Sequence, residues 1–144
     1  MIQIKDINGN VLHTIQDKDT FEELWLEGIN LDGADFRGKN LWGSYFSECS
    51  LRGARFDEAQ VHDLTFTFCD LTGCNFSEMF LWGTEFTYCD LTDCDFSFAD
   101  CEHCDFYSST ITGANFDHGD FAGSSFEVSN GYRTSIEIGH DCYD

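Results

Sequence analysis

Residues 66–77 read FTFCDLTGCNFS, and residues 86–97 read FTYCDLTDCDFS. The two stretches share one pattern at a distance of twenty residues, and within each of them a large apolar residue recurs at every fifth position. The five-residue series extends in both directions without an insertion or a deletion and divides residues 29–128 into twenty pentads. A fixed period of this kind predicts a repeat architecture, in which each unit buries its apolar side against its neighbours.

Positions 1 and 3 of the pentad carry the period. Position 1 is small in all pentads except those that begin with Ile29, Lys39, Leu64 and Met79. Position 3 is large and apolar, with one cysteine among its members. These members are Leu31, Phe36, Leu41, Phe46, Leu51, Phe56, Val61, Phe66, Leu71, Phe76, Leu81, Phe86, Leu91, Phe96, Cys101, Phe106, Ile111, Phe116, Phe121 and Phe126. We therefore expect positions 1 and 3 to point into a core and the other positions to face outward.

A period of five fits neither an α-helix nor a single strand. A helix would spread the position-3 residues around all its sides, and a strand would place successive ones on opposite faces. A square coil, with one pentad on each side and four pentads in each turn, lets every position-3 residue point inward. We number its sides as faces 1 to 4, with position-3 residues 31–111, 36–116, 41–121 and 46–126 in steps of twenty. The sequence thus predicts an all-β solenoid of about five coils, with residues i and i+20 stacked about 4.8 Å apart.

The segment before the repeats, residues 1–28, predicts a cap. Residues 1–15 predict a β-hairpin, because short apolar stretches flank the turn pair Asn8-Gly9. Asp17–Gly28 predicts a short helix that covers the open end of the first coil, since its first turn contains a capping-box pattern and a glycine ends it. An alternative interpretation places Trp25 in a binding site. The segment after the repeats, residues 129–144, predicts a polar tail or cap with one strand over residues 134–138.

The repeat resembles that of the pentapeptide-repeat family, whose unit is a small residue, Asp or Asn, Leu or Phe, and two variable residues. Residues 34–36 read ADF, residues 69–73 read CDLTG and residues 114–117 read ANFD, and the pattern covers 100 of the 144 residues. The resemblance implies a right-handed quadrilateral β-helix. For the best-understood members it also implies proteins that imitate duplex DNA and occupy the DNA-binding surface of type II topoisomerases. Such relatives often dimerise through an apolar C-terminal element that the pattern of residues 129–144 lacks, so a dimer and a monomer both remain open.

Eight cysteines invite a disulfide or zinc interpretation. Six of them occupy position 1, Cys101 occupies position 3, and Cys142 lies in the tail. Used in this way they are small apolar core residues, which predicts free thiols and a reducing compartment. The strongest metal candidate is the Cys-x-x-Cys pair of Cys101 and Cys104 with His103 between them, but both cysteines are already assigned to the core, and no second pair exists. We therefore expect no metal and no cofactor.

The formal net charge is −20. Between Phe56 and Tyr132 there is no Lys or Arg, against 15 carboxylates, all on outward positions within the repeats. This segment spans roughly 18 Å of coil axis, and duplex DNA carries roughly 10 or 11 charges over that length. The charge argues against direct binding of nucleic acid and favours a protein partner that itself binds nucleic acid.

Three large aromatic residues break the outward pattern on face 3: Trp42, Phe80 and Trp82. Rings among carboxylates are typical of protein-binding surfaces, where aromatic anchors supply affinity and charge supplies steering. The stacked pair Phe68 and Tyr88 is interpreted as structural. The predicted acidic part of the binding surface comprises Asp70, Glu85, Asp90, Asp93, Asp95, Asp100, Glu102, Asp105 and Asp120.

Three function classes follow from these features. The first, which we favour, is a non-enzymatic DNA mimic that binds the basic cleft of a DNA-acting enzyme, such as a topoisomerase or a restriction or defence enzyme. The second is an acidic interaction module with a partner unrelated to DNA, and the third is an inert structural rod. An enzyme is not expected, because the histidines have no fixed relation to a nucleophile, and Asp90, Asp93 and Asp95 follow the repeat rather than a calcium-loop pattern. The absence of a long apolar run or a signal-peptide pattern predicts a cytoplasmic protein that does not enter a membrane.

Overall fold

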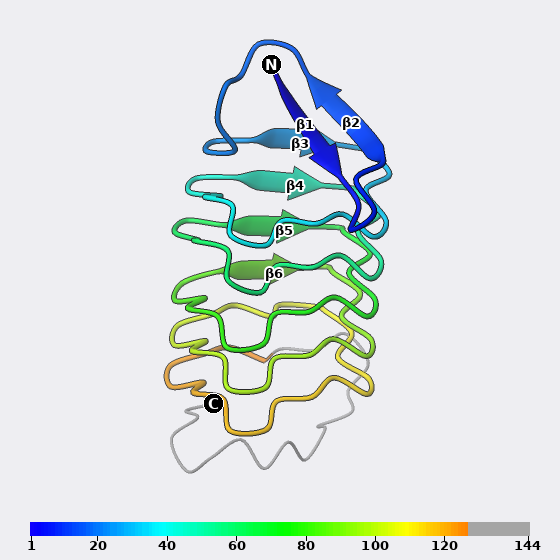
Figure 1. The fold of residues 1–144 in the computed structure, drawn as a ribbon. Coiled ribbons are helices and arrows are strands. Elements are labelled where there is room, and N and C mark those ends of the chain that lie inside the picture. Colours follow the sequence, from blue (N-terminus) through cyan, green and yellow to red (C-terminus); the bar gives the residue numbers. More distant parts are fainter. Residues whose placement is uncertain (127–144) are drawn as a thin grey trace.

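The structure is a computed structural model that describes residues 1–126, and within these residues it consists of strands, turns and no helix (Figure 1). Two strands, β1 (Ile2–Lys5) and β2 (Val11–Ile15), form an antiparallel pair. Four further strands form one parallel sheet in the order β3-β4-β5-β6. Their bounds are Trp25–Glu27 for β3, Tyr45–Ser47 for β4, Thr65–Thr67 for β5 and Glu85–Thr87 for β6.

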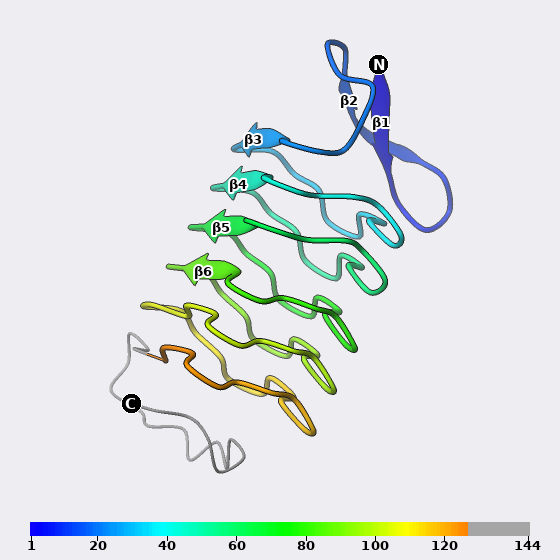
Figure 2. The same cartoon turned by 90° about the vertical axis from the view of Figure 1, so that its left-hand side faces the viewer.

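Successive coils pair with a register of twenty residues. Phe46 of β4 pairs with Phe66 of β5, which pairs with Phe86 of β6. Isolated parallel bridges with the same step occur on the other faces, for example between Asp95 and Asn115. Figure 2 shows the resulting stack of coils beneath β3. The predicted solenoid and its twenty-residue period are confirmed; the last predicted pentad ends at residue 128, outside the described part of the chain.

The phenylalanines of faces 2 and 4 fill the core as two interlocking stacks. Phe76 is fully buried, and its ring lies parallel to those of Phe56 and Phe96, with centroids 4.9 Å and 5.0 Å away. It also meets Phe86 of the opposite face, face 4, edge to face at 5.4 Å. Both arrangements are favoured by the charge distribution of aromatic rings. The core therefore repeats one packing solution from coil to coil.

Position 5 of the pentad makes the corner of each side. Every position-5 residue from Gly33 to Gly123 has a positive φ, and a hydrogen bond such as that from the Ala34 N–H to the Leu31 carbonyl (3.0 Å) closes the turn. Glycine adopts this conformation without strain, as Gly73 does, whereas Asp93 adopts it one coil later at a cost. The turn explains why glycine recurs at this position.

The predicted N-terminal hairpin is confirmed, and it closes the first coil. Ile4 of β1 pairs with His13 of β2, and the Gly9 N–H bonds to the Asp6 carbonyl at 3.0 Å in the connecting turn. The hairpin joins face 2 through a hydrogen bond from the Asp35 N–H to the Lys5 carbonyl (2.8 Å). Its buried face includes Ile2 and Ile4, with Leu12 and Ile15 partly buried against the core.

The predicted helix over Asp17–Gly28 is wrong. The segment contains turns followed by β3, and Glu23 has a φ of 50°, which a helix does not allow. The five-residue series in fact continues back to Phe21 and Leu26, so both residues take core positions. Pairing with the next coil satisfies the backbone, as in the 2.7 Å bond from the Tyr45 N–H to the Leu24 carbonyl. The tail of residues 129–144 and its predicted strand lie outside the described residues.

Candidate protein-binding surface

The nine predicted acidic residues surround the rod rather than gather on one face. Asp70 and Asp90 lie on face 1 and Asp93 at its corner, Asp95 on face 2, Asp100, Glu102 and Asp120 on face 3, and Glu85 and Asp105 on face 4. All nine are exposed or partly exposed. Two pairs of these residues are stacked in successive coils, because Asp70 is bridged to Asp90 and Asp100 is bridged to Asp120. A partner that contacts most of these charges must therefore enclose the rod, and a partner that binds one side contacts only a few of them.

The side chain at position 2 stabilises the turn of its pentad in addition to carrying a charge. The Oδ1 of Asp90 accepts the Thr92 N–H at 3.0 Å, and the same bond recurs from Ser97 to Asp95 at 2.9 Å. Asparagine does the same at other position-2 sites, as in the 2.9 Å bond from the Ser77 N–H to Asn75. One carboxylate oxygen thus fixes the turn locally, in the manner of Asx turns. The second oxygen stays available for a partner.

The cations of the repeats are confined to the N-terminal half. Arg37 is paired with Asp35 and Arg55 with Asp57, each at 2.8 Å. The hydrogen bonds from Arg37 lower the pKa of Asp35. Arg52 lies 3.9 Å from Asp70, which is the one predicted acidic site residue with an arginine pair among the described residues. From Phe56 to the last described residue there are 14 carboxylates and no Lys or Arg.

The three predicted aromatic residues are exposed on face 3. Their exposed fractions are 51% for Trp42, 76% for Phe80 and 55% for Trp82. Trp42 and Trp82 each touch a histidine, with ring centroids 5.5 Å from those of His62 and His103. A depression of about 200 Å³ beside Trp42 is lined by Glu22, Glu23, Trp42, Gly43, His62 and Asp63. Face 3 therefore combines rings and carboxylates, as the sequence predicts.

Face 3 also contains a break in the backbone ladder, which sequence reasoning missed. On the rung above, the Leu41 N–H bonds to the Gln60 carbonyl at 2.8 Å, and on the rung below, the Leu81 N–H bonds to the Asp100 carbonyl at 2.7 Å. Between residues 59–63 and 79–83 the described structure has no such bond, and no bridge joins Gln60 to Phe80. We call this gap the open rung.

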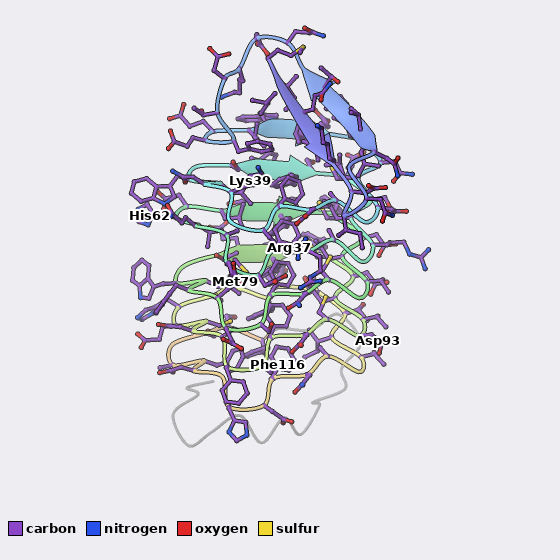
Figure 3. The ribbon with its side chains drawn as sticks, viewed as in Figure 1. Arg37, Lys39, His62, Met79, Asp93 and Phe116 are labelled. Atoms are coloured by element: carbon purple, nitrogen blue, oxygen red, sulfur yellow. The ribbon has the colours of Figure 1, made fainter. Side chains whose placement is uncertain are left out.

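Oversized residues at position 1 account for the open rung. Met79 is buried at a position where the coils above and below have Ala59 and Ala99. Leu64 is buried at the start of the pentad that follows residues 59–63. Met79 and Leu64 lie at opposite ends of the open rung, and we attribute the missing hydrogen bonds to their extra volume, because a packed core has no space to absorb it. Figure 3 shows Met79 inside the coil and His62 pointing away from it. The irregular residues at position 1 were the available signal in the sequence.

Other exposed rings stack along the corners. Phe68 lies flat on Tyr88 with centroids 4.7 Å apart, in agreement with the predicted stack, and Phe98 lies on His118 at 4.7 Å. Trp25 is 75% exposed and contacts Tyr45 at 5.0 Å on face 4. These pairs join residues of neighbouring coils and so contribute to coil stacking.

The cysteines of the described coils are buried free thiols. The thiol of Cys74 donates to the Leu51 carbonyl at 2.9 Å, and that of Cys104 donates to the Leu81 carbonyl at 3.0 Å. Burial raises the pKa of the Cys74 and Cys101 thiols well above their usual value. Among residues 1–126 no group of three His, Cys, Asp or Glu side chains is arranged to hold a metal ion, and no helix is present that could cross a membrane.

Residues 39–116 match a family model described as a pentapeptide repeat region, whereas comparison with curated proteins finds no match. Among solved structures, the pentapeptide repeat protein Rfr23 from the cyanobacterium Cyanothece 51142 is similar, at 15% identity and a TM-score of 0.68 over 74% of this chain and 88% of that chain. A pentapeptide repeat protein of the Arabidopsis thaliana thylakoid lumen matches at 22% identity and a TM-score of 0.41, over 74% and 69% of the two chains. QnrB1, a plasmid-mediated fluoroquinolone resistance protein, matches at 22% identity and a TM-score of 0.45, over 72% and 73%.

Proposed function

Starting from the fact that the chain belongs to the pentapeptide-repeat family, we propose that it is a non-enzymatic, acidic DNA mimic. Its partner is a DNA-acting enzyme with a basic cleft, such as a topoisomerase or a restriction or defence enzyme. The protein occupies that cleft in place of DNA and thereby inhibits or protects the enzyme. It does not bind nucleic acid itself.

The observation that carries the proposal is the charge of the cation-free segment, residues 56–126. Its 14 carboxylates lie along roughly 17 Å of coil axis. Duplex DNA carries roughly 10 charges over the same length. A basic groove shaped around DNA therefore meets a field of the same sign and at least equal density, which steers association.

The distribution of the acids also supports this partner class. The predicted acidic residues lie on all four faces, and the Asp70–Asp90 and Asp100–Asp120 rows repeat with the spacing of the coils. A cleft that encloses duplex DNA contacts its ligand from several sides, so carboxylates on all four faces of the rod can interact with the basic residues of such a cleft. An acidic surface that only maintained solubility would need neither the exclusion of every cation nor exposed rings on face 3.

A competition experiment tests the proposal. The protein is immobilised and incubated with an extract of its native host, and bound proteins are eluted with duplex DNA or, separately, with rising salt. We expect the retained proteins to be DNA-binding enzymes that duplex DNA displaces, with retention falling steeply as salt rises.

The matched control replaces three charges while keeping the turns. In this asparagine variant (Asp90→Asn, Asp95→Asn and Asp105→Asn) the amide oxygen still accepts the position-4 N–H, as Asn30, Asn75 and Asn115 do. The variant should retain the same enzymes more weakly. Partners that bind DNA and this protein together without mutual loss would exclude the mimic and establish an ordinary acidic interaction module.

A further inference from the structure

The open rung on face 3 places unpaired backbone acceptors next to exposed rings and carboxylates. By the pattern of the neighbouring rungs, three hydrogen bonds are missing from the described structure. Their donors are the N–H groups of Val61, Asp63 and Phe80, and their acceptors are the carbonyls of Ala59, Phe80 and Trp82. Phe80 and Trp82 belong to the lower edge of the rung and are exposed by 76% and 55%. The rung is thus a polar gap between coils with aromatic side chains at its border.

Carboxylates stand at both ends of the open rung. Glu58 and Glu78 occupy successive coils at the corner that leads into it, both exposed and both with positive φ. Asp63 lies at the other end and contacts His62, with 3.4 Å between the Oδ2 and the Nε2. Below Phe80, the next coil contributes Asp100 through a parallel bridge.

The Lys and Arg side chains near the open rung do not neutralise the carboxylates at its ends. Arg37, labelled in Figure 3, interacts electrostatically with Glu58, but its guanidinium is paired with Asp35 at 2.8 Å. Lys39 also belongs to face 3, and its Nζ lies 5.1 Å from the centre of the Phe21 ring, in the coil above. Among the described residues, no cation is paired with Glu78 or Asp63 apart from the His62 contact.

We propose that the open rung is the docking point for an arginine side chain of a basic protein partner. A guanidinium has five N–H donors and no acceptor, so it can donate to the carbonyl oxygens of the open rung and to the carboxylates at its ends. Its flat face stacks on aromatic rings, and Phe80 and Trp82 offer such rings in a setting without competing cations. A lysine ammonium is a more strongly hydrated point charge and gains less from the rings. The assignment rests on the proposed function, since it names the residue type that the basic cleft of the partner presents here.

Short peptides test the arginine preference without the partner. Hexa-arginine and hexa-lysine, which carry equal charge, are titrated into the full chain by calorimetry. We expect hexa-arginine to bind about two- to five-fold more tightly. Phe80→Ala and Trp82→Ala should each reduce this ratio toward one. Phe68→Ala removes a ring of similar exposure at the corner between faces 4 and 1, away from face 3, and should leave the ratio unchanged.

The asparagine variant separates this proposal from the general effect of charge. It alters no residue of face 3, so both peptides should bind more weakly while their affinity ratio persists. Equal affinities of the wild-type chain for the two peptides, or a ratio insensitive to Phe80→Ala and Trp82→Ala, would overturn the arginine site. Neither result would decide whether duplex DNA displaces the captured enzymes, so the arginine site and the mimic are tested separately.

Discussion

The hydroxyl of Ser109 donates a hydrogen bond of 2.7 Å to the carbonyl oxygen of Phe86, which lies one coil earlier. The Ser109 Oγ in turn accepts a hydrogen bond from the Cys89 N–H at 3.0 Å, so one buried side chain links two backbone groups that the coil ladder leaves unpaired. Ser44 and Ser124 make the same pair of contacts on face 4. A small polar residue at position 1 therefore acts as a connector between coils.

Ser109→Ala should destabilise the fold by about 1–3 kcal/mol, because it leaves a buried N–H and a buried carbonyl unsatisfied. Equilibrium denaturation with urea measures the change. Ser125→Ala, which alters an exposed serine, serves as the control and should leave the free energy of unfolding nearly unchanged. Equal effects of the two substitutions would show that the connector has no energetic importance.

Phe76→Ala should cost about 3–5 kcal/mol, through the cavity it leaves between the rings of Phe56 and Phe96. Thermal and urea denaturation report the loss. Phe98→Ala removes the same side chain from a site with 60% exposure and should cost far less. A small loss at Phe76 would mean that the phenylalanine stack is not the core that stabilises the rod.

Asp93→Gly should stabilise the protein by about 1 kcal/mol, since Asp93 has a φ of 57° at a corner where the preceding coil places Gly73. Gly73→Asp, the reverse change at the matched site, should destabilise by a similar amount. A Cβ at Gly73 would meet no atom within 4 Å, so the backbone strain is the main term. Melting temperatures of the two variants should move in opposite directions.

The stability should fall at alkaline pH because of the buried thiols. Burial raises the pKa of Cys74 and Cys101, so above about pH 8.5 these thiols ionise in the unfolded chain and stay neutral in the folded one. The unfolded state then binds fewer protons, and two thiols lower the free energy of unfolding by about 2.7 kcal/mol per pH unit. Below the unfolded pKa this contribution is fully present.

Replacing both thiols provides the control for this pH dependence. Alanine fits the site of Cys74, since Ala54 holds the same position one coil earlier, and valine fits the site of Cys101, as at Val61. The variant Cys74→Ala with Cys101→Val should lose stability less steeply between pH 8.5 and 10. An unchanged slope would assign the alkaline effect to other groups.

Most of the fold follows from the pentad pattern alone, because the small and large apolar residues at positions 1 and 3 identify the side chains that are buried. The helix predicted over Asp17–Gly28 failed for a definable reason: local capping signals were weighed above the continuation of the series to Phe21 and Leu26. Inter-coil hydrogen bonding outweighs local helix preference there, as tertiary context commonly does.

The candidate surface was predictable in composition and less so in arrangement. The outward direction of Trp42, Phe80 and Trp82 follows from their pentad positions, and the structure places them as expected. The open rung did not follow, because it depends on how the coils accommodate Met79 and Leu64. The turn bonds of position 2 were also missed, since aspartate there was weighed for its charge alone.

These turn bonds lead to a prediction about the acidic rod itself. The asparagine variant keeps the bonds of Asp90, Asp95 and Asp105 to their position-4 N–H groups and removes three negative charges from a chain of net charge −20. Its melting temperature in low salt should therefore equal or exceed that of the wild type, because like-charge repulsion is relieved. In about 1 M salt, where the screening length is about 3 Å, the difference should vanish. Alanine at the same three sites removes the charges and the turn bonds together, so it should lower stability by about 0.5–1.5 kcal/mol per site. If the asparagine and alanine variants have the same melting temperature, the hydrogen bonds from the position-4 N–H groups to the position-2 side chains do not stabilise the fold, and the carboxylates contribute only charge.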